Sequence, residues 1–197
     1  MTNKPNKLIL NAYHGTDAES AKNILSERKF QFQSRDNHWL GDGVYFFIDD
    51  KDEAEWWSIM AVRHKNRHGS SVSQGAVLFV PIICEKSCIL DLDTYSDGKI
   101  FEDFIESIID KYPNLSFTLS DGQVKQFAET NDEHILMSQW LKLFLAYKKD
   151  SWKAVMKSFP ICSSKEKRNS NPFQMRAKQL NIIDQKIINF DKIIKIV

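Results

Sequence analysis

The chain has 197 residues, of which 42% are hydrophobic and 12% aromatic, enough to fill the core of one domain of ordinary size. We therefore expect a single domain over residues 1–197. The formal net charge of +1 excludes a strong overall attraction to nucleic acid or to an anionic membrane, so either partner would have to bind a local patch.

The first half of the chain alternates strand and helix patterns. Thr16 and Glu19 have the spacing of a capping box, which predicts that a helix follows directly after the first strand. The expected elements are, in chain order, a helix over residues 17–28, a strand over 44–47, a helix that opens at 49–52 and ends before Gly69, and strands over 76–83 and 89–92.

The second half predicts two more helices and two late strands. The expected elements are an amphipathic helix over residues 100–110, a polar and mobile segment over 121–133, a helix over 135–147, and strands over 173–178 and 187–196. Strands at both ends with helices between them indicate an α+β fold rather than alternating βαβ units.

The cysteines and apolar runs predict a reduced, cytoplasmic protein. Cys84, Cys88 and Cys162 are an odd and sparse set, and the chain has no run that could span a bilayer and no signal-peptide pattern. Because no second ligand pair follows Cys84 and Cys88, we expect two buried thiols beside a turn and no metal site. Trp39, Trp56 and Trp57 are expected to be packing residues.

Two glycine-bracketed segments carry the chemistry. The first is Tyr13-His14-Gly15-Thr16, and the second runs from Leu40-Gly41-Asp42-Gly43 into Val44-Tyr45-Phe46-Phe47. A glycine lets the backbone approach a ligand closely, and His14 can hydrogen-bond a sugar hydroxyl. Each residue alone also fits a structural role, since His14 can be a hydrogen-bonded core histidine and Tyr45 a core ring.

In this order the two segments resemble the ADP-ribosyltransferase superfamily, in particular its bacterial members with a His-Tyr-polar triad like that of the poly-ADP-ribose polymerases and diphtheria-type toxins. The resemblance covers most of the chain. It implies an ADP-ribosyltransferase fold, in which split, strongly curved antiparallel β-sheets are flanked by helices and enclose a cleft for NAD. The implied activity is NAD-dependent mono-ADP-ribosyl transfer, without a metal.

The resemblance also implies a role for individual residues. His14 would hydrogen-bond a ribose hydroxyl of NAD, the Gly15 backbone would bind the nicotinamide amide, and Tyr45 would lie against the nicotinamide ring. Thr16 and Gly43 are expected to belong to the same NAD site. The third catalytic position matches Gln174, where the commoner pattern has glutamate, with Arg176 as the neighbour that would share its role. A glutamine can hydrogen-bond the ribose but cannot take a proton from an acceptor.

The acceptor is expected to be a macromolecule. Lys165, Lys167 and Arg168 precede Gln174 and form a basic segment that suits the phosphates of RNA or DNA, although an ordinary solvated loop has the same composition. Bacterial relatives of this size suggest an intracellular toxin of toxin-antitoxin or phage-defence type, with an antitoxin or another neutralising partner. The alternatives are a protein-modifying effector and a non-catalytic module that binds NAD or ADP-ribose.

Overall fold

The computed structural model describes residues 6–69, 71, 74–148, 152–160 and 176–197. Its main elements are β1 (Lys7–Asp17), α1 (Ala18–Glu27), β2 (Val44–Ile48), α2 (Lys51–Arg67), β3 (Gly75–Glu85), β4 (Ile89–Asp91), α3 (Tyr95–Lys111), β5 (Ser116–Thr118), β6 (Val124–Gln126), α4 (Glu133–Lys148), β7 (Ala154–Pro160), β8 (Arg176–Ile182) and β9 (Ile194–Lys195). Short 3-10 helices occupy Lys86–Cys88, Phe127–Glu129, Gln185–Ile187 and Phe190–Lys192. The expected α+β class is confirmed.

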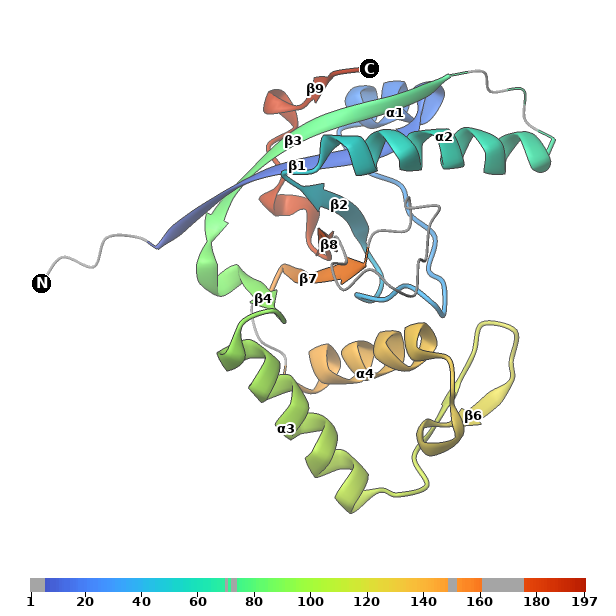
Figure 1. Ribbon diagram of the computed structural model, residues 1–197, viewed down its shortest axis with the longest axis vertical. Coiled ribbons are helices and arrows are strands. Elements are labelled where there is room, and N and C mark those ends of the chain that lie inside the picture. Colours follow the sequence, from blue (N-terminus) through green and yellow to red (C-terminus); the bar gives the residue numbers. More distant parts are fainter. Residues whose placement is uncertain (1–5, 70, 72–73, 149–151, 161–175) are drawn as a thin grey trace, which may run out of the picture.

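Seven strands form one mixed sheet in the order β4-β7-β8-β2-β1-β3-β9 (Figure 1), and β5 and β6 form a separate hairpin. β1 pairs with β3 along its whole length, but it pairs with β2 only at Ala12 and Tyr13. The sheet therefore consists of two halves, β9-β3-β1 and β2-β8-β7-β4, that share a short central junction. The sequence predicted two separate sheets. The structure has one sheet instead, and its two halves diverge beyond this junction.

The two faces of the sheet are covered by different helices. In β3, Leu78 packs in the same core as Ala21 and Ile24 of α1, whereas the neighbouring Val77 packs with Ala54 of α2. Because successive side chains of a strand point to opposite faces, α1 and α2 lie on opposite sides of the sheet. The face that α2 covers near β1 is covered near β4 and β7 by the second core, which includes residues of α3 and α4.

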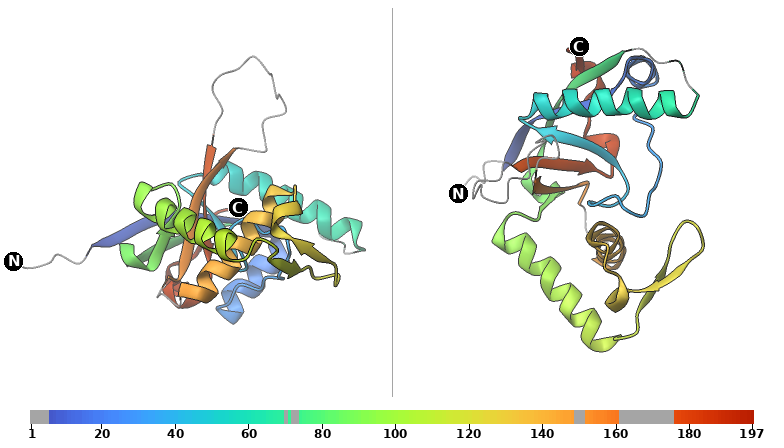
Figure 2. Two further views of the ribbon diagram at one scale, coloured as in Figure 1. Left: turned by 90° about the horizontal axis from the view of Figure 1, so that it is seen from below. Right: turned by 45° about the vertical axis from the view of Figure 1, so that its right-hand side comes forward.

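Helices α3 and α4 and the β5–β6 hairpin form a lobe beside the sheet (Figure 2). Its core contains three aromatic residues that stack edge to face, since the rings of Phe101 and Phe104 lie 5.2 and 5.1 Å from that of Phe144. Leu90 of β4 and Val155 of β7 belong to the same cluster. Burial of these side chains attaches the lobe to the edge of the sheet, at roughly 1.5–3 kcal/mol for each fully buried apolar side chain.

Most expected helices and strands are present, and the second half of the chain requires the following corrections. The segment over residues 121–133, expected to be polar and mobile, contains β6 and a 3-10 turn whose Phe127 ring packs 4.1 Å from Trp140. The expected strand over 187–196 is wrong: it consists of 3-10 turns and the two-residue β9. The side chains of Asp184 and Asn189 accept hydrogen bonds from backbone N–H groups two residues on, which turns the chain locally.

The first helix begins differently from the capping-box prediction. The residue at its N-cap is Asp17, whose carboxylate accepts the N–H of Ser20 at 3.0 Å, while Thr16 still belongs to β1. Asp17 is almost completely buried and pairs with Lys65 of α2 at 2.9 Å. The hydrogen bonds from Ser20 and Lys65 outweigh the cost of burial and lower the pKa of this carboxyl. This pair links α1 to the last turn of α2.

Candidate functional site

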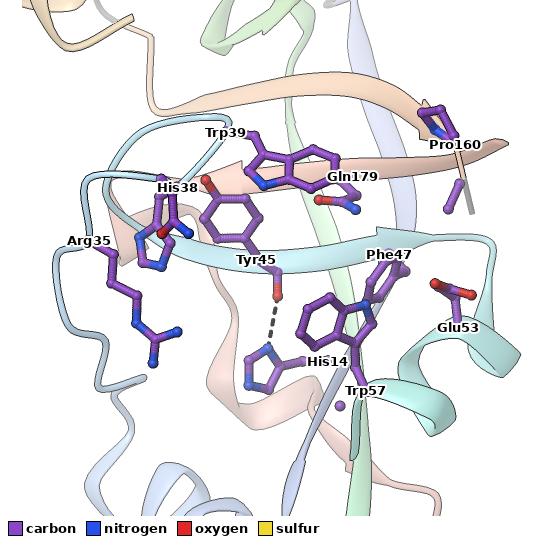
Figure 3. A pocket seen from close by; sticks show the side chains of 13 residues that line it. His14, Arg35, His38, Trp39, Tyr45, Phe47, Glu53, Trp57, Pro160 and Gln179 are labelled. Atoms are coloured by element: carbon purple, nitrogen blue, oxygen red, sulfur yellow. Dashed lines mark hydrogen bonds between the residues drawn. The ribbon is translucent and has the colours of Figure 1, made fainter. Parts of the chain in front are cut away.

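A cavity of about 310 Å³ opens where the two halves of the sheet diverge. It is bounded by β1, β2, β8, the first turns of α2 and the segment between α1 and β2 (Figure 3). The residues that line it are His14, Gly15, Arg35, Asn37, His38, Trp39, Tyr45, Phe47, Glu53, Trp57, Pro160, Ala177 and Gln179. This volume is at the lower end of the range of about 300–1,000 Å³ that is typical of small-molecule sites.

His14 lies in the gap between β1 and β2. Its Nδ1 is 2.8 Å from the carbonyl oxygen of Tyr45, and because a carbonyl can only accept, Nδ1 carries the proton and donates it. The ring contacts Phe30 and Phe46 at 5.1 and 5.5 Å between centroids. Burial lowers the pKa of His14, which favours the neutral ring. In that tautomer Nε2 is a hydrogen-bond acceptor, suited to a hydroxyl group of a ligand.

The peptide groups of Gly15 point toward the cavity. Gly15 lies opposite Val77 of β3, but the N–H of Val77 donates to the carbonyl of Val197 and its carbonyl accepts the N–H of Ile196. The N–H and C=O groups of Val77 therefore point away from β1. In an antiparallel pair, two opposite residues either both point these groups at each other or both point them away, so those of Gly15 point away from β3, toward the β2 half. The pairing of β1 with β2 ends at Tyr13, two residues earlier. The N–H and carbonyl of Gly15 therefore face the opening between the halves.

The hydrogen bond of His14 contributes to this opening. If the pairing of β1 and β2 continued in register, Tyr45 would lie opposite Gly15. The Tyr45 carbonyl instead accepts from the His14 side chain. Gly15 is also required for packing, because a Cβ at this position would lie 1.9 Å from the carbonyl oxygen of Ala54 in α2. The glycine brings α2 against β1, and its bare face contacts the helix rather than the cavity.

Tyr45 presents its ring to the cavity and its hydroxyl to the protein. The hydroxyl accepts the N–H of Leu40 at 2.8 Å and donates to the carbonyl of Gly41 at 2.9 Å. Burial raises the pKa of Tyr45, so the hydroxyl stays protonated at neutral pH. The hydroxyl is occupied by the segment before β2, and only the ring can contact a ligand.

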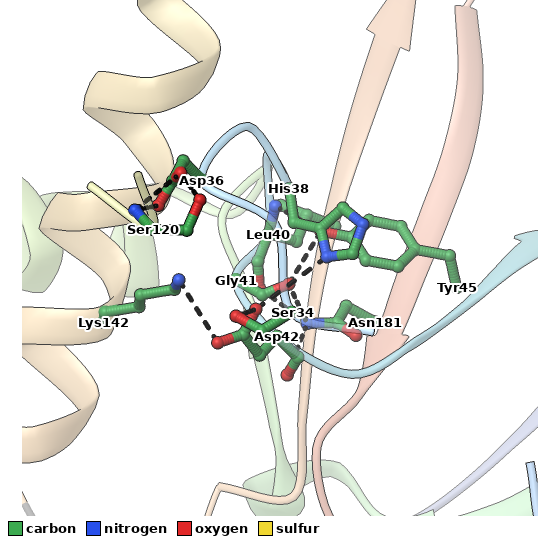
Figure 4. A network of polar contacts seen from close by, with 10 residues as sticks. All are labelled: Ser34, Asp36, His38, Leu40, Gly41, Asp42, Tyr45, Ser120, Lys142 and Asn181. Atoms are coloured by element: carbon green, nitrogen blue, oxygen red, sulfur yellow. Dashed lines mark hydrogen bonds and ion pairs between the residues drawn. The ribbon is translucent and has the colours of Figure 1, made fainter. Parts of the chain in front are cut away.

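The segment before β2 is held on two sides (Figure 4). On the sheet side, the buried Asn181 donates from Nδ2 to the carbonyls of Leu40 and Gly41 at 2.7 and 3.2 Å. On the side of the helical lobe, Lys142 of α4 pairs with Asp42 at 3.2 Å. Trp39, which lines the cavity, stacks on His134 of α4 at 4.0 Å. The cavity wall is thus attached to both the sheet and the lobe.

The two ends of the cavity differ in charge. Figure 3 places Arg35 and His38 at one end and Glu53 and Trp57 at the other, with Tyr45 and His14 between them. Burial and the nearby Arg35 lower the pKa of His38, so this ring too favours the neutral form. A ligand that fits this distribution has an anionic group at the Arg35 end and an aromatic or cationic group at the other end.

The structure brings some of the predicted residues together and places others elsewhere. His14, Gly15 and Tyr45 line one cavity, whereas Thr16 and Gly43 do not line it. A Cβ at Gly43 would lie 2.2 Å from the side-chain oxygen of Asn181, so this glycine serves packing against β8. Arg176 is exposed, and its guanidinium donates to the carbonyl of Ser158 at 2.8 Å.

The predicted third catalytic residue falls outside the described residues. This holds for Gln174 and equally for Lys165, Lys167 and Arg168 of the basic segment. Within the described part of β8, the polar residue that lines the cavity is Gln179, opposite Phe47 of β2. The alternation of side chains along the strand could have identified this residue. Leu180 and Ile182 are buried in the core, so Gln179 has to face the other side of the strand.

Glu53, Arg35 and Trp57 were also missed as residues of the site. Glu53 and Trp57 lie one helical turn apart on α2, and such a spacing gives a shared face but does not tell which surface it meets. Trp57 packs as expected against Phe47 and Trp56, but it is also 43% exposed and lines the cavity. Arg35 lies in an irregular segment, where no periodicity predicts the direction of a side chain.

The described residues contain no group of three or more His, Cys, Asp or Glu side chains that could hold a metal ion. Cys84 is buried and Cys88 partly so, on either side of the turn after β3, and both are free thiols. None of the helices in the described part of the chain is long and apolar enough to cross a membrane.

Comparison with known proteins adds a relative but no activity. No protein-family model matches the chain, and no solved structure matches it. A stretch of 98 residues, 49% of the chain, is 36% identical to the uncharacterized protein MJ0359 of Methanocaldococcus jannaschii. The match covers 43% of that relative, so less than half of its length is represented.

Proposed function

We propose that the protein is an NAD-dependent mono-ADP-ribosyltransferase that modifies a macromolecule. The observation that carries this proposal is the meeting of His14, the Gly15 backbone and the Tyr45 ring in one cavity. These residues were selected from the sequence because they suit NAD, and they come from strands that pair at only two positions. The cavity thus combines an imidazole, an aromatic ring and an open peptide edge, which are the groups that the resemblance assigns to NAD binding.

The distribution of charge suggests how NAD would lie. The nicotinamide ring would occupy the end with Glu53 and Trp57, beside the ring of Tyr45 and the peptide groups of Gly15. Nε2 of His14 would accept a ribose hydroxyl. Arg35 would meet the pyrophosphate, because a guanidinium binds phosphate oxygens through paired hydrogen bonds. The cavity holds part of NAD, and the remainder would extend across its mouth.

In the proposed reaction, the bond between C1′ of the ribose and the nicotinamide nitrogen breaks. The electron pair of the bond moves to the ring nitrogen, which neutralises the pyridinium and leaves an oxocarbenium-like sugar. An oxygen or nitrogen of the acceptor then bonds to C1′ and loses a proton to water or to a basic group. Without an acceptor, water takes this role, and the products are ADP-ribose, nicotinamide and a proton.

A glutamine at the third position would stabilise the developing positive charge through its carbonyl dipole, but it would not remove the acceptor's proton. Gln179 fits this role by its place in the cavity, and Gln174 remains the match from the sequence pattern. The acceptor atom therefore has to be reactive already, or a nearby group such as Arg176 or Glu166 has to assist. A glutamine at this position therefore suits transfer to a weakly nucleophilic protein side chain less well than the commoner glutamate does.

For the acceptor, RNA or DNA is favoured by the basic residues Lys165, Lys167 and Arg168. A toxin with such an acceptor would need an antitoxin or another neutralising protein in its own cell. Replacing the three basic residues with glutamine should weaken acceptor modification and flatten its salt dependence, while hydrolysis of NAD without acceptor stays nearly unchanged. Modification of a protein is the second possibility.

The decisive experiment uses labelled NAD, the purified protein and a cell lysate. Release of free nicotinamide excludes a module that merely binds NAD or ADP-ribose. Digestion of the labelled product with nuclease and, separately, with protease identifies the acceptor class. A label that survives nuclease and is released by protease contradicts a nucleic-acid acceptor. No release of nicotinamide and no labelled product with any lysate would refute the transferase.

A further inference from the structure

The second half of helix α2 carries an excess of positive charge. The acidic residues of the helix all lie before residue 56, whereas Arg63, Lys65 and Arg67 lie in its last two turns. Lys65 is paired with the buried Asp17. Arg63 and Arg67 are exposed, and no carboxylate in the described part of the chain pairs with either of them. These two guanidinium groups are therefore available to a ligand.

The two arginines share one side of the helix with Trp56. With 3.6 residues per turn, positions 56, 63 and 67 lie within about 40° of one another around the helix axis. Ala54 and Ser58, which are buried, lie on the opposite side. Trp56, Arg63 and Arg67 thus form a row along the outer face of α2.

The middle of α2 also exposes apolar side chains. Trp57 is 43% and Ile59 is 49% exposed, and Trp56 and Met60 are partly exposed. The rings of Trp56 and Trp57 meet edge to face, with 5.3 Å between their centroids, and Trp57 lines the cavity. Cations near the end of a helix complement its dipole and need no ligand, but the dipole does not account for an exposed apolar surface beside them.

An aromatic surface next to two free cations suits a single strand of nucleic acid. Unpaired bases stack on aromatic rings, and guanidinium groups bind phosphate oxygens. Arg63 and Arg67 lie one helical turn apart, about 6 Å along the axis, so they can contact neighbouring phosphates of one strand. A duplex suits this surface less well, because it offers phosphates while its bases are already paired and stacked.

We propose that the outer face of α2 binds a single strand of RNA or DNA, with a base on Trp56 and phosphates at Arg63 and Arg67. This inference rests on the proposed function, because the bound strand would be the acceptor. A base on Trp56 would lie beside Trp57 and hence beside the cavity, so a neighbouring nucleotide can reach the cavity mouth. The second half of α2 extends beyond β2 to the outside of the molecule (Figure 1 and Figure 2), where the strand would continue.

The first test measures binding without NAD. A fluorescently labelled oligonucleotide of about 12 residues is titrated with the unmodified protein, as single-stranded RNA, as single-stranded DNA and as a duplex, and its anisotropy is followed at several salt concentrations. We expect a single strand to bind at least about tenfold more tightly than the duplex, and the two single strands show whether RNA or DNA is preferred. No binding of either single strand at low salt, or equally tight binding of the duplex, overturns the proposal.

The second test uses variants of α2. Replacing Arg63 and Arg67 together with glutamine should weaken binding at least about tenfold at low salt and flatten the log-log salt slope by about 1.4, since each phosphate contact on a single strand contributes about 0.7. Trp56→Ala should weaken binding about 5- to 150-fold and leave the salt slope unchanged. The control replaces Lys22 and Lys192 with glutamine, which removes the same charge from exposed positions beside the α1 core.

The control should keep the affinity and the salt slope of the parent. Equal weakening by the control and by the arginine variant would show a general effect of net charge and refute the site. Unchanged binding in the arginine variant would place the strand elsewhere and also refute it. If Trp56→Ala does not fold, as judged by its thermal unfolding, the arginine variant and its control still decide.

The outcomes separate this inference from the proposed function. A protein that cleaves NAD but binds neither single strand refutes the α2 site and leaves a transferase with a protein acceptor. A protein that binds a single strand on α2 but releases no nicotinamide refutes the transferase and leaves α2 as a nucleic-acid-binding surface.

Discussion

Replacing Tyr45 with phenylalanine would separate the two roles that the structure gives this side chain. The hydroxyl holds the segment before β2 through Leu40 and Gly41, while the ring lines the cavity. Tyr45→Phe removes only the oxygen. We therefore expect a less stable protein that still cleaves NAD, with turnover within about threefold of the parent if the residual ring position is kept.

The size of the stability loss follows from the fate of each partner. The Gly41 carbonyl keeps a hydrogen bond from Asn181 at 3.2 Å, so it is not left unpaired. Leu40 is completely buried, and its N–H loses the partner that Tyr45 provides. One hydrogen bond of about 1 kcal/mol plus one stranded donor at about 1–3 kcal/mol gives a loss of about 2–4 kcal/mol in the free energy of unfolding.

The assay is denaturant unfolding followed by tryptophan fluorescence, together with nicotinamide release from NAD. Tyr45→Ala, which also removes the ring, should lose on the order of 100-fold in NAD cleavage. Tyr95→Phe is the matched control, because Tyr95 is 85% exposed and should change neither quantity. A Tyr45→Phe protein as stable as the parent, or one as inactive as Tyr45→Ala while folded, would show that the roles are assigned wrongly.

Three further changes test the rest of the site. His14→Ala should reduce NAD cleavage on the order of 100-fold without unfolding the protein. Burial lowers the pKa of His14 below its ordinary 6.5, so the unfolded chain binds the proton more readily than the folded protein does. The free energy of unfolding of the parent should therefore fall as the pH drops from 6.5 through the folded-state pKa. The same loss of stability over this pH range in His14→Ala would contradict this. Gly15→Ala should lower the free energy of unfolding by about 3 kcal/mol or more in denaturant titrations, because the new Cβ would lie 1.9 Å from the Ala54 carbonyl oxygen. A variant as stable as the parent would refute this packing of α2 on β1. Gln179→Ala should abolish most NAD cleavage whereas Gln179→Glu keeps part of it; loss in Gln174→Ala alone would return the third role to Gln174.

The sequence predicted best those features that local patterns determine. The helices over residues 17–28 and 135–147 correspond to α1 and α4, because their apolar residues repeat with the helical period. The strand β7 was not expected: it lies between β4, which is remote in sequence, and β8, which is the next strand along the chain. The strand predicted for the C-terminal segment was wrong. Its isoleucines favour a strand, but the side chains of Asp184 and Asn189 accept backbone hydrogen bonds that turn the chain.

Only those residues of the site that belong to short sequence motifs could be predicted. His14, Gly15 and Tyr45 were selected from two short segments, and they do share a cavity. Glu53 could not be selected, because its burial depends on the close approach of α2 to Gly15, which is a tertiary contact. Gln179 lies in a strand that was expected to end at residue 178, so the alternation of its side chains was not followed far enough.

The cavity depends on the helical lobe as much as on the sheet. Arg35 and His38 reach the cavity on a segment with no regular structure of its own, so their positions have to be determined by its attachments. One attachment is to β8 through Asn181, and the other is to the lobe, where the carboxylate of Asp36 accepts the N–H of Ser120 at 3.0 Å.

An exposed ion pair or hydrogen bond contributes at most about 1 kcal/mol. Several such contacts on one short segment act together, however, and they hold the Arg35 end of the cavity at a fixed distance from the Glu53 end on α2. The spacing of the two charged ends, on which a single orientation of NAD would depend, is thus determined by the sheet and the lobe together.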